Sequence, residues 1–349
     1  MIEWEEQQTE VREMKVVDMH CDTIAEIYKR RQSGEECNLR KNQLHIDLEK
    51  MKAGDYGLQN FALFTALDRV DNPFEHAMKL ADLFYEEMEA NSDLIGAVKS
   101  YEDIEANWKA GRMSALMTIE EGGVCKGELA FLRDFYRMGV RMMTLTWNFP
   151  NELGYPNMKS PDSGHSGDPE TIDAEHGLTE KGIEFLAEME RLGIIIDVSH
   201  LNDAGIWDVF KYTKKPFVAS HSNTRGVVPG CPRNLSDEMI RELAERGGVA
   251  GINYYIGFLH NEKDWKEGES RRSLISDMIL HMKHMKKIGG IGCIGLGSDF
   301  DGIGGVLDLS SAADLPLLED GMRKAGFTSS EIEAVFHGNV LRVYKEILR

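Results

Sequence analysis

Two residues that could bind a metal ion, His20 and Asp22, stand two positions apart at the end of a short apolar stretch. This stretch, residues 16–23, has the character of a β-strand, and side chains two residues apart on a strand project from the same face. Cys21, which lies between them, is expected to point away. An imidazole and a carboxylate that project together can hold one cation, so the pair predicts a site that other strand ends must complete.

Four later apolar stretches end in side chains of the same two kinds. These side chains are Glu120, His200, His221 and, after the last stretch, Asp299 and Asp301. One histidine at a strand end is usually explained by a hydrogen bond, but five strand ends that carry imidazole or carboxylate groups favour a shared metal site. The elements that bear these groups must therefore bring their ends together.

Eight apolar stretches have strand character, and helical patterns separate most of them. They cover residues 16–23, 58–65, 114–119, 140–147, 194–200, 217–222, 248–255 and 291–301. Strands buried on both faces that alternate with helices are typical of a parallel barrel with an outer ring of helices. We therefore predict an α/β fold, a single (β/α)8 TIM-type barrel, whose active site lies at the C-terminal ends of the strands. A doubly wound open sheet would usually show a glycine fingerprint after its first strand, which is absent.

The whole chain, residues 1–349, is predicted to form one domain, because no linker rich in proline, glycine or serine divides it. The longest irregular stretch, residues 148–173, follows the fourth strand, and loops of this length are often lids or binding loops. We expect it to lie over the active site. The C-terminal residues are expected to form a helical extension.

Composition excludes several classes of partner. The 349 residues carry a formal net charge of −19, which argues against nucleic acid and anionic membranes as partners. The chain has no apolar run of the roughly 20 residues that a membrane span requires. The first residues are acidic and polar, unlike a signal peptide. The five cysteines are scattered, as in a reduced protein, so we expect a cytoplasmic location.

Histidine and carboxylate ligands without cysteine suit zinc, with manganese, iron or cobalt as substitutes. The three strand-end histidines, Asp22 and Glu120 exceed the needs of one open catalytic site, so we expect two metal ions. Glu120 is the expected bridge, because it leaves a central strand of the set. Two ions about 4 Å apart can activate a bridging hydroxide that attacks a carbonyl. Asp299 would then carry the proton, which makes Asp299 and Glu120 the candidate catalytic residues.

Six motifs, in order, closely resemble those of the membrane (renal) dipeptidase family of zinc peptidases. They are His20-Cys21-Asp22, Thr118-Ile119-Glu120, Asp197-Val198-Ser199-His200, Ser220-His221-Ser222, Arg233-Asn234 and Ser298-Asp299-Phe300-Asp301-Gly302. The resemblance extends over nearly the whole chain. It implies a metallo-dependent hydrolase barrel that holds two Zn²⁺ ions per subunit, hydrolyses L,L- and L,D-dipeptides and forms a homodimer.

The resemblance also implies individual roles. The implied metal ligands are His20 and Asp22 for the first zinc ion, His200 and His221 for the second, and Glu120 for both. Asp299 would be the acid/base and Arg233 would hold the free carboxylate of the substrate. Tyr255, at the end of the seventh strand, falls where the family has a tyrosine that contacts the substrate.

The chain departs from the family after the fourth strand. Members such as the renal enzyme have a histidine after Thr-Leu-Thr, whereas this chain continues with Trp147 and Asn148. An indole N–H can donate a hydrogen bond, but tryptophan cannot take up a proton or ligate a metal. We expect both residues to line a modified substrate pocket. An alternative substrate is therefore another small amide, such as an N-acyl amino acid or a lactam, and a degenerate, non-catalytic scaffold is a further alternative.

A second departure is the doubled Glu120-Glu121. Alignment on the preceding strand makes Glu120 the ligand, whereas alignment on the following glycines makes it Glu121. Adjacent strand residues face opposite ways, so one of the two is expected to reach the metals, and the strand register favours Glu120. Elsewhere, His281 and His284 lie on a lysine-rich helix, where we expect a solvated face. His45 has no carboxylate partner at a useful spacing.

Overall fold

The computed structural model describes residues 15–157, 174–261 and 271–348, and in them eight parallel strands close into a barrel. In their order around the barrel these are β1 (Val16–Asp18), β2 (Tyr56–Phe64), β4 (Met113–Glu120), β5 (Met142–Thr144), β6 (Ile195–Asp197), β7 (Val218–Ala219), β8 (Val249–Ile252) and β10 (Ile294–Leu296). β2 pairs with both β1 and β4, which closes the ring. Each strand coincides with a predicted one, so the (β/α)8 barrel is confirmed.

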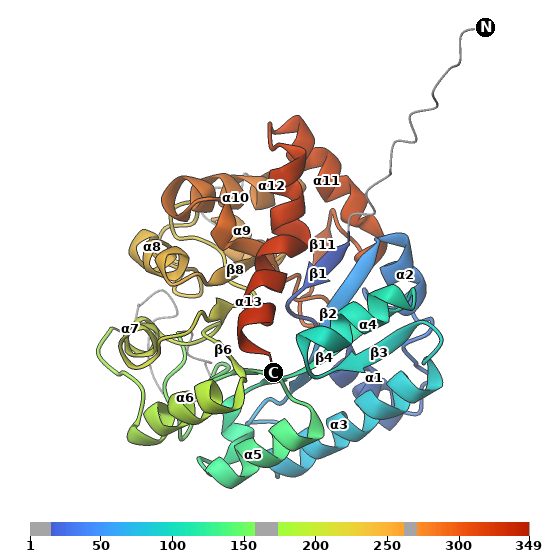
Figure 1. Cartoon of the computed structure of the whole chain (residues 1–349), viewed down its shortest axis with the longest axis vertical. Helices are drawn as coiled ribbons and strands as arrows, with labels where there is room; N and C mark the ends of the chain where they lie inside the picture. Colours follow the sequence, from blue (N-terminus) through green and yellow to red (C-terminus); the bar gives the residue numbers. More distant parts are fainter. Residues whose placement is uncertain (1–14, 158–173, 262–270, 349) are drawn as a thin grey trace, which may run out of the picture.

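Helices surround the barrel (Figure 1). They are α1 (Thr23–Gln32), α2 (Leu48–Ala53), α3 (Pro73–Ala90), α4 (Tyr101–Lys109), α5 (Leu129–Met138), α6 (Glu180–Leu192), α7 (Asp203–Tyr212), α8 (Asp237–Glu245), α9 (Ile256–Leu259), α10 (Ile275–Gly289), α11 (Leu315–Lys324), α12 (Ser329–Glu333) and α13 (Asn339–Ile347). Many begin at a side chain that accepts a backbone N–H from the first turn, such as Asn72 at α3 and Ser236 at α8. These caps explain why the helices start at these positions.

The strands are buried on both faces because helices cover the outside and side chains fill the inside. All eight residues of β4 are buried, and β2 pairs with β4 over seven residues. The interior is narrow at Gly297, where a Cβ would overlap the Ser220 carbonyl. A close packed barrel of this kind fixes the positions of its strand ends.

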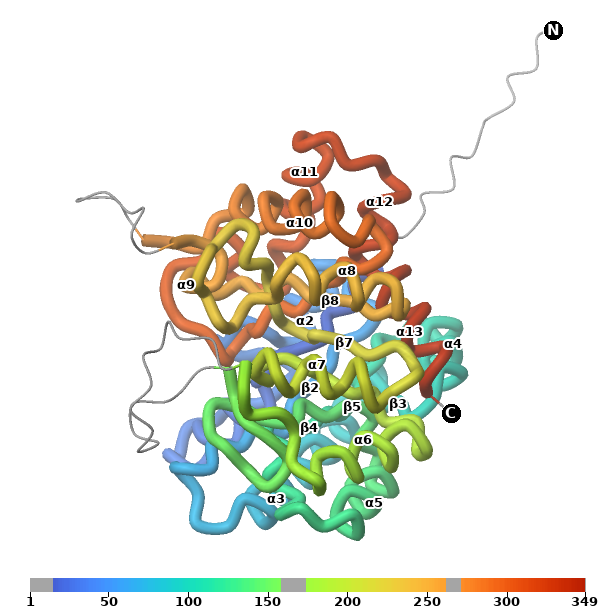
Figure 2. Tube along the Cα trace, turned by 90° about the vertical axis from the view of Figure 1, so that its left-hand side faces the viewer, coloured from blue at the N-terminus to red at the C-terminus, as the bar shows by residue number. Residues whose placement is uncertain are grey.

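The C-terminal helix α13 lies across the N-terminal end of the barrel, at the centre of the view in Figure 1. Val340 and Tyr344 belong to the same apolar cluster as residues at or near the starts of several strands, including Val17, Leu58 and Val249. The Asn60 side chain donates a 2.6 Å hydrogen bond to the Tyr344 hydroxyl. Figure 2 shows α13 and α9 at opposite ends of the barrel. The strands finish at the end near α9, and this end is open to a functional site.

Two pairs of elements were not predicted. β3 (Ile95–Val98) pairs with the first half of β4 and leads into α4, and β9 (Arg272–Ser273) pairs with β11 (Val306–Leu307) in a separate small sheet. The strands concerned have two to four residues, too few for a periodic pattern to stand out. β3 joins the barrel sheet at β4 without changing the order of the eight strands, and β9 and β11 lie outside that sheet.

The predicted solvated face on α10 is wrong. His281 is fully buried: its Nδ1 accepts a hydrogen bond from the Thr224 N–H (3.2 Å), and its Nε2 lies 3.1 Å from the Leu259 carbonyl. His284 is half-buried and lies 2.6 Å from an Asp237 oxygen. The helix packs this face against α8 and the chain after β7, contacts that its lysines conceal in the sequence.

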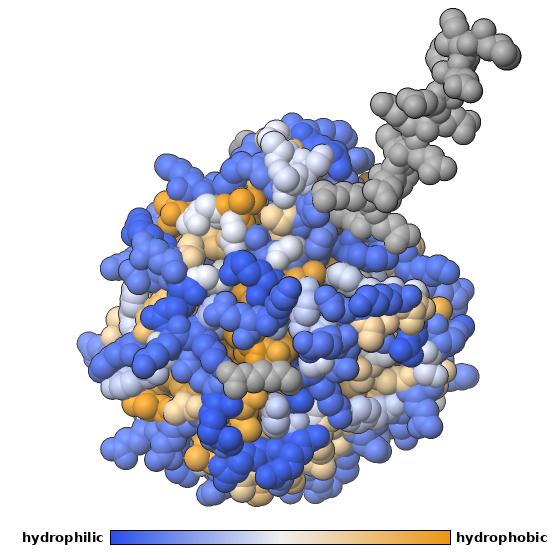
Figure 3. All heavy atoms as spheres, in the orientation of Figure 1, coloured by the Kyte–Doolittle hydropathy of each residue, from blue (hydrophilic) through white to orange (hydrophobic). Residues whose placement is uncertain are grey.

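The face drawn in Figure 3 is largely hydrophilic, with hydrophobic residues in small areas between polar ones. Among the described residues, no helix has the length and apolar character needed to cross a bilayer. Of the long loop predicted over the site, residues 148–157 are described and residues 158–173 lie outside the described residues. In the described part, Asn157 donates its backbone N–H to the carbonyl of His200 (2.7 Å).

Candidate metal centre

The polar side chains at the C-terminal strand ends converge on one point. Glu120 is the last residue of β4, and His20, His200, His221 and Asp299 follow within three residues of the ends of β1, β6, β7 and β10. Four of these five residues are buried, and the side chain of Asp299 is only 13% exposed. Residues nearly 280 positions apart in the chain therefore meet because the barrel aligns its strand ends.

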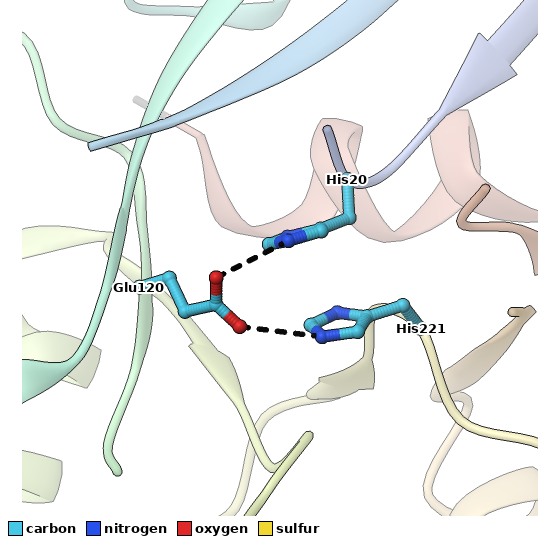
Figure 4. A group of neighbouring side chains, drawn as sticks. All are labelled: His20, Glu120 and His221. Atoms are coloured by element: carbon cyan, nitrogen blue, oxygen red, sulfur yellow. Dashed lines mark ion pairs between the residues drawn. The ribbon is translucent and has the colours of Figure 1, made fainter. Parts of the chain in front are cut away.

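Glu120 lies at the centre of this cluster. Its Oε2 is 3.4 Å from His20 Nε2, and its Oε1 is 3.1 Å from His200 Nε2 and 3.4 Å from His221 Nε2. Figure 4 shows its carboxylate beside the rings of His20 and His221, with one oxygen toward each, and the two rings stack on each other with their centroids 3.8 Å apart. One carboxylate thus presents one oxygen to each half of the cluster.

Asp22 and Asp299 extend the cluster on the His20 side. His20 Nε2 lies 3.6 Å from Asp22 Oδ2 and 3.9 Å from Asp299 Oδ1. These three residues can offer ligand atoms that lie within 4.8 Å of one another, as can His20, Glu120 and His221. Gly302 closes this side, because a Cβ there would overlap both the Asp22 and the Asp299 carboxylates.

Glu121 points away from the cluster and serves the neighbouring loop. Its carboxylate accepts backbone hydrogen bonds from Trp147 (2.9 Å) and Gly123 (2.7 Å) and a side-chain hydrogen bond from Asn151 (2.5 Å). Burial raises the pKa of Glu121 to about 7. Of the two adjacent glutamates, the structure therefore places Glu120 among the histidines and Glu121 under the loop that carries Trp147.

The imidazoles of His200 and His221 are each held by a neutral partner at Nδ1. His200 Nδ1 lies 3.1 Å from Asn148 Oδ1, and His221 Nδ1 lies 2.6 Å from Ser220 Oγ. Metal-binding histidines commonly use their second nitrogen in this way, which fixes the tautomer and leaves Nε2 for the metal. Asn148, predicted to bind substrate, lines the cavity but also makes this contact with His200.

Several backbones at the strand ends are strained. His200, Asp299 and Glu121 have φ values of 67°, 62° and 88°, in the left-handed region that non-glycine residues rarely adopt. Strain of this kind concentrates at functional sites, where the surrounding structure enforces it. At Asp299, for example, the backbone N–H donates to the His20 carbonyl (3.2 Å) and the backbone carbonyl accepts the Gly302 N–H (3.1 Å).

The electrostatics of the cluster fit cation binding. Burial lowers the pKa of His200 and of His221 well below the usual range, with help from the positive charge of Arg233. Burial raises the pKa of Glu120, and neighbouring acids add to the effect. For His20, burial is outweighed by the charges of Glu120 and Asp22, which raise its pKa well above normal. Two neutral imidazoles and several crowded carboxylates are suitable metal ligands.

A cavity of about 770 Å³ opens onto the cluster. Its walls combine site residues with aromatic and aliphatic side chains, among them Asp22, Glu120, His200, Asp299, Trp147, Asn148, Tyr255, Phe64, Phe258 and Ile303. Trp147 packs edge-on against Phe64, with ring centroids 4.9 Å apart. Trp147 therefore forms part of an aromatic wall of the cavity.

Arg233 is fully buried beside this cavity. Its guanidinium lies 5.3 Å from the Phe258 ring centroid and donates from Nη1 to Ser222 Oγ (2.7 Å). Nε and Nη2 have no hydrogen-bond partner in the described part of the chain. A buried guanidinium with two unused donors is costly, and a carboxylate is its natural partner.

Some residues have roles that the sequence reasoning missed or misjudged. Asp301 turns away from the cluster, where its carboxylate accepts hydrogen bonds from Thr23 Oγ1 (2.6 Å) and the backbone N–H of His45 (2.7 Å). His45 thus has the carboxylate partner that its spacing did not reveal. Asn253, which donates to Asp299 Oδ2 (2.8 Å), had no sequence signal beyond its position at the end of β8.

Fold and site together define the class of protein, a metal-dependent hydrolase built on a (β/α)8 barrel. Residues 5–349 match the model of the membrane dipeptidase family, peptidase family M19. The chain therefore belongs to this family, as the motifs predicted, and is a metal-dependent dipeptidase.

Individual relatives agree. An uncharacterized dipeptidase of Schizosaccharomyces pombe is 31% identical over 86% of this chain and 72% of its own length. The crystal structure of dipeptidase AC, a metallopeptidase, has a TM-score of 0.85 and 25% identity over 96% of this chain and 99% of its own. A metallopeptidase from Rhodobacter sphaeroides, liganded with a phosphinate mimic of the dipeptide L-Ala-D-Ala, shares the fold with a TM-score of 0.83 and 24% identity over 96% of this chain and 99% of its own.

Proposed function

We propose that the protein is a dinuclear zinc dipeptidase that hydrolyses both L,L- and L,D-dipeptides. The observation that carries the proposal is the position of Glu120, whose two oxygens face His20 on one side and His200 and His221 on the other. A carboxylate in this position can bridge two metal ions, which would hold them close enough to act on one substrate.

The residues present fit two zinc ions. Neither ring nitrogen of His20 has a hydrogen-bond partner within the described residues, and the same is true of Asp22 Oδ1, although all three atoms are buried. Such atoms are costly unless a ligand occupies them. Histidine nitrogens and carboxylate oxygens without cysteine are a donor set that zinc accepts. His20 and Asp22 would hold one ion, His200 and His221 the other, and Glu120 both.

When bound, the zinc ions supply Lewis acidity toward the scissile carbonyl and make a water molecule more acidic. The remaining work falls to the chain. Asp299 is close to the cluster, with Oδ1 3.9 Å from His20 Nε2, and Asn253 holds its Oδ2. Burial raises the pKa of Asp299, which favours proton exchange near neutral pH. We assign it the transfer of a proton to the leaving amine.

The buried guanidinium of Arg233 supports a substrate with a free carboxylate. Its unused Nε and Nη2 donors can bind both oxygens of a C-terminal carboxylate, which would place the peptide bond over the metal cluster. Tyr255 lines the cavity that opens onto the cluster and is assigned a substrate contact, as are Trp147 and Asn148. The resemblance to the family supports tolerance of a D-residue at the C-terminal position.

A second candidate substrate is another small amide with a carboxylate, such as an N-acyl amino acid or a lactam. Trp147 favours it, because the aromatic wall that Trp147 forms with Phe64 offers apolar surface where the family has a polar histidine. An acyl chain or a fused ring would bury more of that surface than a free amino group does.

One experiment tests both candidates. The purified protein is analysed for metal content and assayed on L,L- and L,D-dipeptides and on N-acyl amino acids. We expect two zinc ions per chain and release of free amino acids from dipeptides. A protein with two zinc ions that cleaves only N-acyl amino acids would favour the second candidate. Cleavage of neither class would contradict the proposed function.

We further propose a homodimer in the cytoplasm. All five cysteines are free thiols and four of them are buried, which supports a reducing compartment. The dimer rests on the family resemblance. Light scattering on the purified protein gives the mass in solution, and a monomer at micromolar concentration would refute the dimer.

A further inference from the structure

Three buried hydroxyl groups lie in a row next to His221, one of the proposed metal ligands. Ser199 Oγ is 3.4 Å from Ser220 Oγ and 3.2 Å from Ser222 Oγ. The side chains are 0%, 0% and 2% exposed, and they come from the adjacent ends of β6 and β7. A buried hydroxyl group destabilises the fold unless it has a hydrogen-bond partner. The groups that contact the two ends of the row therefore indicate what the row does.

At one end the row reaches a proposed metal ligand. Ser220 Oγ donates to Asp197 Oδ2 (2.5 Å), so its lone pairs are free to accept a hydrogen bond from His221 Nδ1, 2.6 Å away. The proton on His221 is thereby held at Nδ1, and Nε2 is presented to Glu120. This end fixes the orientation of the imidazole.

At the other end the row reaches the guanidinium of Arg233. Ser222 Oγ accepts from Nη1 at 2.7 Å, whereas Nε and Nη2 have no hydrogen-bond partner within the described residues. The Nε–H group and one Nη2–H group lie on the same edge of the planar guanidinium and form a fork that matches a carboxylate. Ser222 thus occupies one side of the guanidinium and leaves the two buried donors of the fork without a partner among the described residues.

We infer that Ser222 is a positioning residue for substrate binding, because it holds Arg233 so that its Nε–Nη2 edge receives the C-terminal carboxylate. Ser199 and Ser220 connect Ser222 to His221, which sets the spacing between the carboxylate and the proposed metal ligands. A fixed spacing selects the peptide bond one residue from the carboxylate, as in a dipeptide. The inference rests on the proposed function. It names the residues that limit the substrate to a dipeptide.

A purely structural role for Ser222 makes a different prediction. If the hydroxyl only stabilises the fold, its loss would affect every substrate equally. If it positions Arg233, its loss would affect substrates that carry a C-terminal carboxylate and spare those that do not. The contrast between a dipeptide and its C-terminal amide therefore separates the two roles.

The test compares wild type with Ser222→Ala, both loaded with zinc, on a cleavable dipeptide and on the same dipeptide as its C-terminal amide. We expect kcat/KM for the free acid to fall about tenfold, mainly through KM, and kcat/KM for the amide to change less than about twofold. Zinc content should be unchanged. Equal losses on both substrates would overturn the inference.

Ser114→Ala is the matched control, because Ser114 is also a buried barrel serine, whose Oγ accepts from Asn107 Nδ2 (3.3 Å) in the first half of β4. It should leave the ratio of acid to amide rates unchanged. Should Ser222→Ala fold poorly, Ser199→Ala breaks the row one step further from Arg233, and a smaller shift in the same direction is expected. No shift in that folded variant would contradict the link to His221.

Calorimetric binding of the free amino acid product, compared with its amide, gives a readout that does not require turnover. Weaker binding of the acid to Ser222→Ala, with binding of the amide unaltered, supports the inference even if the wild type cleaves no dipeptide. In that event the proposed function fails while the carboxylate site stands. Equal binding of the acid to both proteins would refute the role of Ser222.

Discussion

The two halves of the metal centre are held in different ways. In the β6–β7 half, the Nδ1 atoms of His200 and His221 have uncharged partners, Asn148 and Ser220. In the β1–β10 half, His20 makes no hydrogen bond through either ring nitrogen within the described residues, and stacks on the ring of His221. The first half is oriented by the protein itself, whereas the second is surrounded by carboxylates.

Each half nevertheless begins with the same device, a buried aspartate at the end of its first strand. Asp197 Oδ1 accepts the backbone N–H groups of Ser199 (3.0 Å) and Ser220 (2.8 Å), which joins the ends of β6 and β7. Asp18 Oδ1 accepts those of His20 (3.1 Å) and Ser298 (3.0 Å), which joins the ends of β1 and β10. One carboxylate oxygen thus sets the spacing of two strand ends in each half.

The two aspartates differ in the hydrogen bonds of their second carboxylate oxygen, Oδ2. Asp197 Oδ2 accepts hydrogen bonds from Thr144 (2.7 Å) and Ser220 (2.5 Å), whereas Asp18 Oδ2 has no hydrogen-bond partner in the part of the chain that the structure describes. Burial accordingly raises the pKa of Asp18. The β6–β7 half is therefore organised before a metal binds, whereas the β1–β10 half depends on cations to offset its crowded carboxylates.

The largest effect is expected where the carboxylates of the β1–β10 half are most crowded. Gly302→Ala would place a methyl group on the Asp22 and Asp299 carboxylates. The two residues would have to move by about an ångström, and kcat/KM should fall at least about 100-fold. Steady-state assays with saturating zinc measure the loss.

The control is Gly292→Ala, because nothing lies within 4 Å of the position its Cβ would take. This variant should keep the activity of the wild type. If Gly302→Ala also kept full activity, the β1–β10 half would tolerate displacement of its carboxylates. That result would contradict the proposed difference between the two halves.

The next effect concerns the neutral partner of His200. Asn148→Ala removes the oxygen 3.1 Å from His200 Nδ1 and with it the orientation of the ring. We expect zinc affinity at one of the two sites to fall about 10- to 100-fold, the cost usually seen when such a partner is lost. A competition titration against a zinc chelator gives both affinities. A uniform loss at both sites would show that the two halves are not held independently.

Much of this arrangement could be predicted from the sequence because it follows from strand order. Once the alternation of strands and helices indicates a barrel, His20, Glu120, His200, His221 and Asp299 must meet at its C-terminal end. Their distances then follow from the barrel. The register of β4 was also enough to favour Glu120 over Glu121.

The rest depends on side-chain contacts that no spacing encodes. The motifs contain Ser199, Ser220 and Ser222, but the hydrogen bonds between these serines form only when β6 and β7 lie side by side. His281 was misjudged because its lysine neighbours suggest solvent, while packing against Thr224 buries it. The positions of the strand ends could therefore be predicted from the sequence. The side-chain partners that lie far apart in the chain could not.

The paired aspartates give a more modest effect on stability. Asp197→Asn replaces an oxygen that accepts two hydroxyl hydrogen bonds with an amide that cannot accept them, and should lower the free energy of unfolding by about 1.5 kcal/mol. Asp18→Asn removes a buried charge from an oxygen without a hydrogen-bond partner in the described chain and should cost less than about 0.5 kcal/mol. Urea denaturation at saturating zinc compares them, and equal losses would contradict the difference between the halves.

The smallest effect is a pH dependence of the β6–β7 half that does not involve the proposed ligands. His281 supports the chain after β7, because its Nδ1 accepts the backbone N–H of Thr224. Burial lowers the pKa of His281 to about 4 from a normal value of 6.5. The unfolded state therefore binds more protons between these values, so the stabilisation is complete above pH 6.5 and is lost as the pH falls toward 4.

Between pH 6.5 and 5.5 the loss from this one residue should be about 1 kcal/mol. Other groups titrate in the same range, so the relevant measurement is the difference between wild type and His281→Asn, followed by urea denaturation at each pH. The asparagine variant should be less stable at pH 7.5 but should lose about 1 kcal/mol less over this interval. Parallel curves would mean that the acid sensitivity of this half lies elsewhere, in the histidines of the cluster itself.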